Sequence, residues 1–144
     1  MDIETREDVE RLVRAFYTKA LADPIIGWIF TDIAQLDLEE HVPQIASFWE
    51  TILLGAQSYR GGAFRPHAEL HLKVGLREGH FDRWLQLWFA TVDELFQGDR
   101  ANVAKIHALR VARAFLSRLE NFPDPDAAAQ PGGLTVTQHG PRRP

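Results

Sequence analysis

Apolar side chains recur every three or four positions in four segments of this chain, and this helical periodicity restricts its fold more than any other property. The first three segments end at Asp23, at Gly55 and at Gly98, and the fourth begins at Asp99. No segment alternates apolar and polar residues over a useful length, so strands are not expected. The sequence therefore predicts an all-α protein with four or five main helices.

Local signals predict how these helices begin. Thr5 followed by Asp8 resembles a capping box, in which two residues satisfy the free backbone amides of a helix start. Asp99 is placed to cap the last helix. Pro43 falls inside the second helix, where proline removes a backbone donor and disfavours helical geometry at the preceding residue. We therefore expect a late start or a kink beside His41.

The 144 residues are a usual length for one domain, and the chain contains no repeat. Beyond Glu120 the composition changes, because five of the eight prolines and three of the ten glycines lie there. Such a stretch provides too little apolar surface to fold. We expect one folded domain over residues 1–121, a disordered tail over residues 122–144, and a monomer or weak dimer.

Charge and cysteine content exclude several classes of function. The chain carries 16 basic and 20 acidic residues, a net charge of −4, and no stripe of lysine and arginine, so neither nucleic acid nor a membrane is an expected partner. Without cysteine there is no disulfide, thiolate nucleophile, zinc–cysteine site or protein-held iron–sulfur cluster. The acidic start lacks the basic and apolar parts of a secretory signal, which favours a cytoplasmic protein. Six histidines remain as the main source of metal ligands.

Five side chains are notable for their chemical type: Tyr17, Phe30, His41, His67 and Trp84. Taken singly, each is more simply explained as part of the core. The two histidines are more informative as a pair. From His41 the second helix runs about 20 Å to its end, and the connection that follows can span up to roughly 40 Å. The chain can thus pass under a flat ring, such as an iron porphyrin, and place His67 on the other side.

Several strings of residues between about residue 5 and residue 120 together match the pattern of one protein family. They are Phe16-Tyr17, Phe30 thirteen positions after Tyr17, His41-Val42-Pro43-Gln44-Ile45 before Phe48-Trp49, Tyr59 before His67-Ala68-Glu69-Leu70, and His80-Phe81-Asp82-Arg83-Trp84-Leu85 before Leu87. With these strings the chain resembles the truncated haemoglobins, and within them the group III branch. The resemblance implies a truncated globin fold, a 2-on-2 helical sandwich around haem b (iron protoporphyrin IX).

The resemblance also assigns roles to individual residues. His67 matches the proximal histidine, which is the protein's ligand to the iron. Tyr17 and Trp84 match the distal pair that faces a bound diatomic ligand, and His41 matches the distal helix position on the side where ligands approach. Phe30 matches the phenylalanine that lies against the porphyrin. The other cofactor-binding positions that the resemblance implies are Ile45, Phe48, Trp49, Leu70 and Phe81.

His71 is the competitor of His67 for the iron. It lies four residues further along the chain, so a small error of register would exchange the two histidines. The positions of Tyr59, eight residues before His67, and of Leu70, three residues after it, favour His67 as the metal ligand.

The distal pair determines the chemistry that we expect. Oxygen on ferrous iron gains negative charge, so the Tyr17 hydroxyl and the Trp84 indole N–H each contribute about 1.5–3 kcal/mol, or roughly a ten- to hundredfold gain in ligand retention. Carbon monoxide gains less charge and less stabilisation. We expect binding of O2, CO, NO and small anions such as cyanide, with slow oxygen release and an unidentified reductase as partner.

Two alternatives remain open at this point. An enzyme would use the same pocket for nitric oxide dioxygenation or peroxide chemistry, with the distal pair polarising the O–O bond and His41 moving protons or gating access. A helical protein without haem would hold zinc or non-haem iron between His67 and His71, which share a helix face, with Glu78 or His80 completing the shell.

Overall fold

Five helices dominate the described part of the chain, which comprises residues 1–59, 61, 67, 71 and 75–120 of a computed structural model. They are the α-helices α1 (Arg6–Leu21), α2 (Leu38–Leu54), α4 (Glu78–Leu95) and α5 (Asp99–Leu119), and the π-helix η1 (Ile29–Ile33). No strand occurs among the described residues. The prediction of an all-α fold is therefore confirmed, whereas the predicted tail over residues 122–144 lies outside the described residues.

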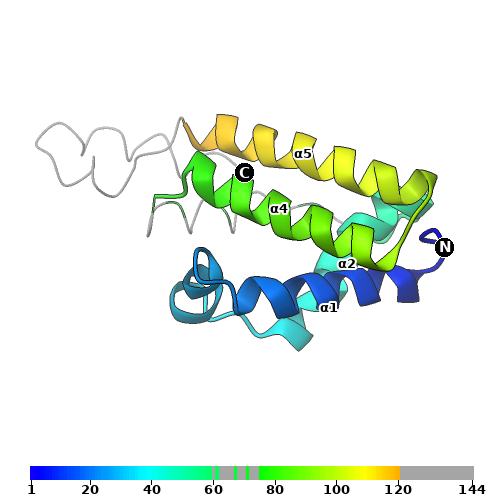
Figure 1. Ribbon diagram of the computed structural model, residues 1–144, viewed down its shortest axis with the longest axis horizontal. Helices are drawn as coiled ribbons and strands as arrows, with labels where there is room; N and C mark the ends of the chain where they lie inside the picture. The colour runs from blue at the N-terminus through cyan, green and yellow to red at the C-terminus, as the bar shows by residue number, and fades with distance from the viewer. Residues whose placement is uncertain (60, 62–66, 68–70, 72–74, 121–144) are drawn as a thin grey trace, which may run out of the picture.

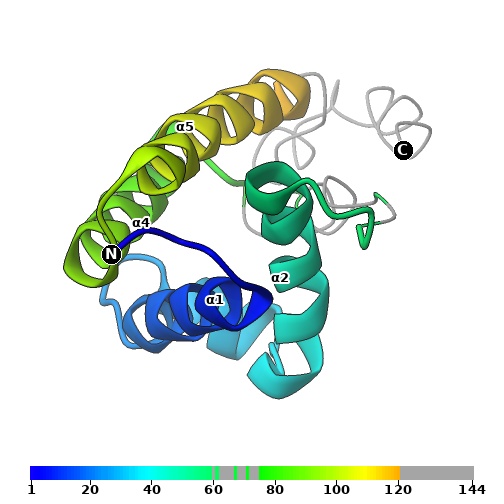
Figure 2. The same cartoon turned by 90° about the vertical axis from the view of Figure 1, so that its right-hand side faces the viewer.

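The four α-helices form two pairs that pack on each other. Helix α1 packs against α2 and against α4, α4 packs against α5, and a smaller contact joins α2 to α5. Figure 1 shows α4 and α5 side by side with α1 running below α4, and Figure 2 shows the α1–α2 pair facing the α4–α5 pair. The largest side chains of the main core are Trp49, Trp88, Phe16 and Phe96. No described helix has both the length and the apolar character needed to span a bilayer.

Helix α1 begins as its sequence predicts. The Thr5 hydroxyl accepts a hydrogen bond from the backbone N–H of Asp8, and the Asp8 carboxylate accepts one from the N–H of Thr5, both at 3.1 Å. This capping box satisfies amides that a helix start otherwise leaves free. The residues of α1 that enter the core are Val9, Leu12, Val13, Phe16 and Ala20.

Helix α2 starts before Pro43, so of the two predicted possibilities, a late start or a kink, the late start is wrong. Asp37 caps the helix, which then continues through Pro43 to its end. The carbonyl of Pro43 accepts a hydrogen bond from Arg6 Nη2 at 3.1 Å, so a side chain of α1 supports the helix at this point. The stop at Gly55 is confirmed, because this glycine has a φ of 74° in the left-handed region.

The start of α5 differs from the prediction. Asp99 is the first helical residue rather than the cap, and the preceding Gly98 has no side chain for capping. Instead the Asp2 carboxylate accepts hydrogen bonds from the backbone amides of Arg100 and Ala101, each at 2.9 Å. A Cβ on Gly98 would lie 2.6 Å from Asp2 Cγ, so glycine allows this approach. The group that caps α5 thus belongs to Asp2, near the N-terminus, and no residue next to α5 in the sequence indicates it.

Candidate functional site

Three of the sequence-predicted site residues lie in one aromatic cluster that is built from α1, η1 and α4. The Tyr17 ring makes edge contacts with Phe16 on the same helix, at a centroid distance of 4.9 Å, and with Phe30 on η1, at 5.7 Å. The Trp84 ring of α4 joins the cluster by an edge contact with the Phe16 ring, at a centroid distance of 5.8 Å. Tyr17, Phe30 and Trp84 are thus brought together although up to 67 positions separate them in the sequence.

A row of stacked indoles fixes the position of Trp84. Trp84 stacks on Trp88, one helical turn further along α4, at 5.9 Å and an interplanar angle of 7°. Trp88 stacks in turn on Trp49 of α2 at 4.6 Å. Trp88 is 1% exposed, and its indole N–H donates to the carbonyl of Ala104 on α5 at 3.1 Å. The row therefore connects Trp84 to three of the four α-helices and leaves its ring little freedom to move.

The polar atoms of Tyr17 and Trp84 have no hydrogen-bond partner among the described residues, in contrast to the indole N–H of Trp88. Tyr17 is half-buried, and burial raises the pKa of its hydroxyl to about 12. The Tyr17 hydroxyl and the Trp84 indole N–H are both hydrogen-bond donors, so their chemistry suits an acceptor that binds beside the cluster.

His41 lies in the first turns of α2 and is half-buried. Its Nδ1 is 2.9 Å from the carbonyl of Asp37. Since a carbonyl only accepts, Nδ1 is assigned the proton in the neutral ring, and Nε2 keeps a lone pair. No ring contact joins His41 to the aromatic cluster within the described part of the chain.

The other predicted cofactor-binding residues divide between two parts of the core. Ile45, Phe48 and Trp49 of α2 belong to or pack on the main core, and Phe48 also makes an edge contact with Tyr59 at 5.1 Å. Phe81 of α4 is buried in a second cluster, formed mainly with residues of η1 and α5. Leu70 lies outside the described residues.

The two candidate metal ligands, His67 and His71, both have helical backbone conformation. His67 is half-buried, and its ring centroid lies 4.7 Å from that of Phe115 on α5. His71 is only 6% exposed, and its Nδ1 has no hydrogen-bond partner among the described residues. A buried histidine nitrogen without a protein partner, as Nδ1 of His71 is, suits a metal or cofactor. No local pattern in the sequence indicates that His71 is the more buried of the two.

The hypothesis of a metal site without haem receives no support from the described residues. None of them form a group of three or more potential metal ligands. The Nδ1 of His80 accepts a hydrogen bond from the backbone N–H of Arg77 at 3.0 Å. His80 therefore caps the start of α4 through its Nδ1.

Two features of the surroundings are absent from the sequence-based prediction. Asp23 and Arg83, 60 positions apart, form an ion pair of 2.6 Å between the end of α1 and α4. His107 of α5 lies against Phe48 and Trp49 at 6.5 and 6.1 Å, where burial, followed by the nearby charge of Arg110, lowers its pKa. Only the tertiary structure brings these residues together, so no local pattern indicates them.

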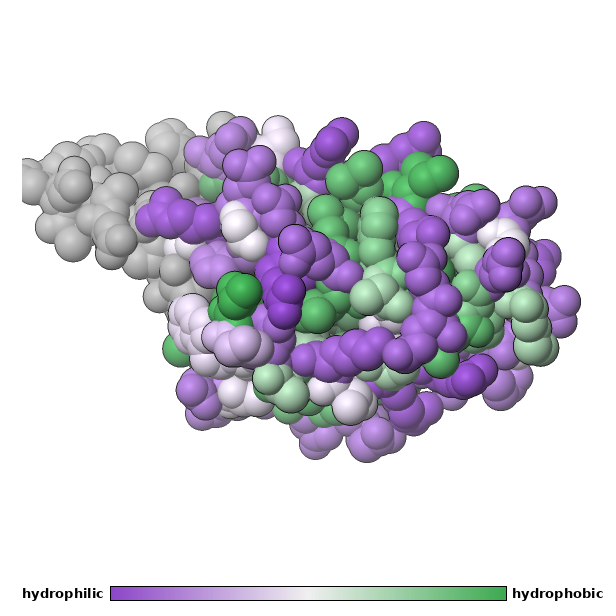
Figure 3. Space-filling model, viewed as in Figure 1, coloured by the Kyte–Doolittle hydropathy of each residue, from purple (hydrophilic) through white to green (hydrophobic). Residues whose placement is uncertain are grey.

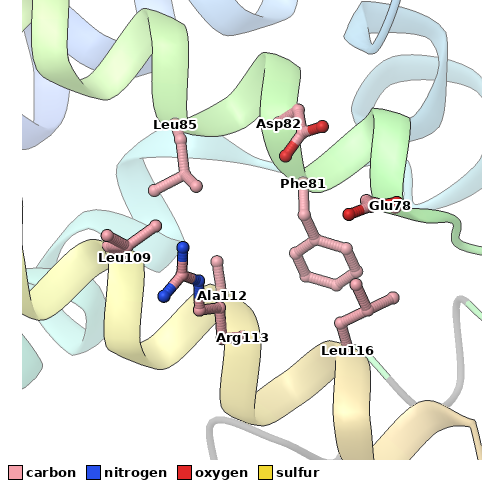
Figure 4. A pocket seen from close by; sticks show the side chains of 8 residues that line it. All are labelled: Glu78, Phe81, Asp82, Leu85, Leu109, Ala112, Arg113 and Leu116. Carbon is pink, nitrogen blue, oxygen red and sulfur yellow. The ribbon is translucent and has the colours of Figure 1, made fainter.

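A small pocket of about 110 Å³ between α4 and α5 is separate from the aromatic cluster (Figure 4). Its lining residues are Glu78, Phe81, Asp82, Leu85, Leu109, Ala112, Arg113 and Leu116. Pockets for drug-sized ligands and cofactors usually measure about 300–1,000 Å³, so a porphyrin does not fit here. Figure 3 shows polar and apolar residues mixed on the surface over α4 and α5. Of the predicted haem-binding residues only Phe81 lines the pocket, and Glu78, a candidate ligand of the metal site without haem, lines it as well.

Comparisons with known proteins agree on one family. The profile of the Bacterial-like globin family matches residues 2–116. The Group 3 truncated hemoglobin ctb of Campylobacter jejuni subsp. jejuni serotype O:2 is 29% identical over 127 residues, which are 85% of this chain and 98% of that protein. The crystal structure of group III truncated hemoglobin from Campylobacter jejuni matches with a TM-score of 0.71 and 27% identity, over 83% of this chain and 95% of the other.

Proposed function

Because this chain belongs to the bacterial-like globin family and has the fold of a group III truncated haemoglobin, we propose that it binds oxygen and other diatomic ligands reversibly. Membership of the globin family implies haem, and haem b supplies a ferrous iron that takes up such ligands when it is bound. One observation carries the proposal: Tyr17 and Trp84, from two different helices, present unpartnered donors beside the ring of Phe16.

The two donors explain how the pocket favours oxygen. A diatomic ligand that gains negative charge accepts hydrogen bonds from the Tyr17 hydroxyl and the Trp84 indole N–H, and each bond to such an acceptor contributes about 1.5–3 kcal/mol. Because the pKa of Tyr17 is raised to about 12, its hydroxyl keeps its proton at every physiological pH and remains a donor. Carbon monoxide gains less, so the donors discriminate between the two ligands. Slow release suits sensing or reaction at the iron better than oxygen delivery.

On the proximal side we propose His67 as the iron ligand. The family pattern supports it, and the contact with Phe115 provides an aromatic neighbour that would hold the ring in place. The unpartnered Nδ1 of His71 is the observation in favour of the alternative. Phe30 and the partly buried residues of α2, Ile45 and Phe48, provide apolar walls that exclude water from a haem.

A second function, in which the same pocket turns over its ligand, is favoured by His41. With Nδ1 bound to the Asp37 carbonyl, Nε2 is free to accept or pass on a proton. Nitric oxide and oxygen would then combine to nitrate, with one electron per turnover from a reductase. Nitrate formation at a catalytic rate supports this function, and reversible oxygen binding without nitrate or peroxide turnover argues against it.

The absorption spectrum of the reduced protein, with and without carbon monoxide, tests the assignment. We expect an intense haem band in the wild type and loss of the five-coordinate ferrous form in His67→Gly, while His71→Gly retains it. Added imidazole should restore the spectrum of His67→Gly, which separates loss of the ligand from misfolding. The opposite pattern, with loss only in His71→Gly, would assign the iron to His71.

A further inference from the structure

The Asp23–Arg83 ion pair joins the turn after α1 to the residue that directly precedes Trp84, and it is held by two hydrogen bonds. Asp23 Oδ1 accepts two hydrogen bonds from Arg83, one from Nε at 2.9 Å and one from Nη2 at 2.6 Å. The carboxylate is 3% exposed and the arginine side chain 30% exposed. A charge-assisted contact with this much burial stabilises more than an ion pair in free solvent.

The second oxygen of Asp23 holds the chain that leads into η1. Oδ2 accepts hydrogen bonds from the backbone amides of Ile25 and Ile26, both at 3.0 Å. The turn is tight, because a Cβ on Gly27 would lie 2.6 Å from the carbonyl oxygen of Leu21. One carboxylate therefore connects the turn after α1 to helix α4, which Figure 1 shows passing above the turn.

The groups on either side of this pair belong to the candidate site. Trp84 follows Arg83 directly on α4, and Phe30 lies at the end of the turn, where it contacts Tyr17. Between them, Ile26 and Ile29 of the turn pack in the same buried cluster as Phe81 of α4. A displacement of the turn relative to α4 would therefore change the position of Trp84 relative to Tyr17 and Phe30.

We propose that Asp23 and Arg83 are positioning residues of the distal pocket, which fix the turn against α4 and so set the spacing between the Tyr17–Phe30 wall and the Trp84 indole. The inference rests on the proposed function and deepens it. A hydrogen bond weakens steeply when its distance or angle is poor, so a small shift of the turn is sufficient to reduce the bonds to a ligand. Neither residue touches the ligand, and both act through the aromatic cluster.

Asp23→Asn and Arg83→Gln in the haem-loaded full chain test the proposal. Asp23→Asn removes the negative charge but keeps a side-chain oxygen that can accept from the backbone N–H groups of Ile25 and Ile26. Arg83→Gln removes the positive charge and leaves Asp23 and its turn unchanged. We expect oxygen dissociation to become roughly tenfold faster in each variant, CO dissociation to change by less than about twofold, and the double variant to be no faster than the single ones. Arg83→Lys should recover part of the slow release.

Two further measurements separate positioning from stability. The NMR shift of the Trp84 indole N–H should move in both variants, which a loss of stability alone does not cause. Asp93→Asn is the matched control, because Asp93 also lies on α4 and binds Lys105 of α5 at 2.6 Å, but is nine positions from Trp84 in the sequence. This control should leave both release rates and the indole shift unchanged.

The outcomes distinguish the inference from the function on which it rests. Haem-loaded variants with wild-type oxygen release and an unchanged indole shift would overturn the inference alone, as would an equal effect of Asp93→Asn. A wild-type chain that takes up no haem would overturn the proposed function and the inference with it. If Asp23→Asn does not fold, Arg83→Gln carries the same test, because the turn keeps its carboxylate.

Discussion

The two halves of helix α4 differ in how their tryptophans use their polar groups. In the C-terminal half, which leads into α5, the Trp88 indole N–H donates to the carbonyl of Ala104, and Asp2 caps the start of α5. In the N-terminal half, one turn away, the Trp84 indole N–H has no hydrogen-bond partner among the described residues, and neither has the Tyr17 hydroxyl of the same aromatic cluster. Both tryptophans stack in one row of rings, so packing alone does not explain the difference. We take the C-terminal half as a source of stability, and under the proposed function the donors beside the N-terminal half serve a ligand.

Trp88→Ala is the strongest test of the stability that the C-terminal half of α4 provides. The change removes a fully buried indole, its hydrogen bond and its stacking contacts with Trp84 and Trp49. We expect a loss of about 3–5 kcal/mol in the free energy of unfolding, measured by denaturant titration. A loss below about 1 kcal/mol would show that this half of the helix is not a source of stability.

Asp23→Asn is expected to cost less, about 1–3 kcal/mol at pH 7, and its cost should depend on pH. The bond from Arg83, assisted by the amides of Ile25 and Ile26, holds the pKa of Asp23 below its ordinary value. A lowered pKa means that the stabilisation is fully present above the unfolded-state value of about 3.9 and is lost as the pH falls through the folded-state pKa. Unfolding curves of the two proteins should therefore converge in acid. A constant gap down to about pH 2 would argue against the ion pair as its cause.

Asp2→Ala tests the long-range cap of α5. Partial burial raises the pKa of Asp2, but hydrogen bonds from Arg100, Ile3 and Ala101 outweigh it and lower the pKa overall, so the carboxylate is the stable form at pH 7. Loss of a helix cap costs about 0.5–2 kcal/mol, which thermal unfolding should show as a lower Tm. Asp99→Ala is the control, since the sequence-based prediction assigned the cap to that residue. An equal effect of the control would contradict the assignment to Asp2.

Tyr17→Phe should have the smallest effect on stability. Its hydroxyl makes no hydrogen bond within the described residues, and the ring contacts with Phe16 and Phe30 survive the substitution. We expect the free energy of unfolding of the protein without ligand to change by less than about 0.5 kcal/mol. A loss above about 1.5 kcal/mol would mean that the hydroxyl has a structural partner, and the contrast between the two halves of α4 would fail.

The sequence was sufficient for features that depend on neighbouring residues. Helical periodicity predicted the all-α fold, and local motifs predicted the capping box at Thr5 and the stop at Gly55. Pro43 misled the prediction for α2, because the Asp37 cap and the Arg6 side chain support the helix around it. Local motifs do not indicate contacts between residues that lie far apart in the sequence. The Asp2 cap spans 98 positions to Arg100, and the Asp23–Arg83 pair spans 60.

In the candidate site, too, contacts between distant residues have no local signal in the sequence. Tyr17, Phe30 and Trp84 could be grouped before the structure was known only through the likeness to a family, since nothing in their local sequence relates them to each other. The structure then places them in one cluster through ring contacts with Phe16 and with each other. The burial of His71 depends on tertiary packing and has no sequence signal. Its assignment relative to His67 therefore depends on the spectra described above.

The rate of oxygen dissociation from Tyr17→Phe, measured beside that of carbon monoxide, tests the central claim most directly. If the unpartnered donors serve a ligand, oxygen should leave roughly ten to a hundred times faster than from the wild type, while carbon monoxide release changes far less. Trp84→Phe should show the same selectivity. Oxygen release at the wild-type rate in both variants would contradict the claim that the donors beside the N-terminal half of α4 serve a ligand.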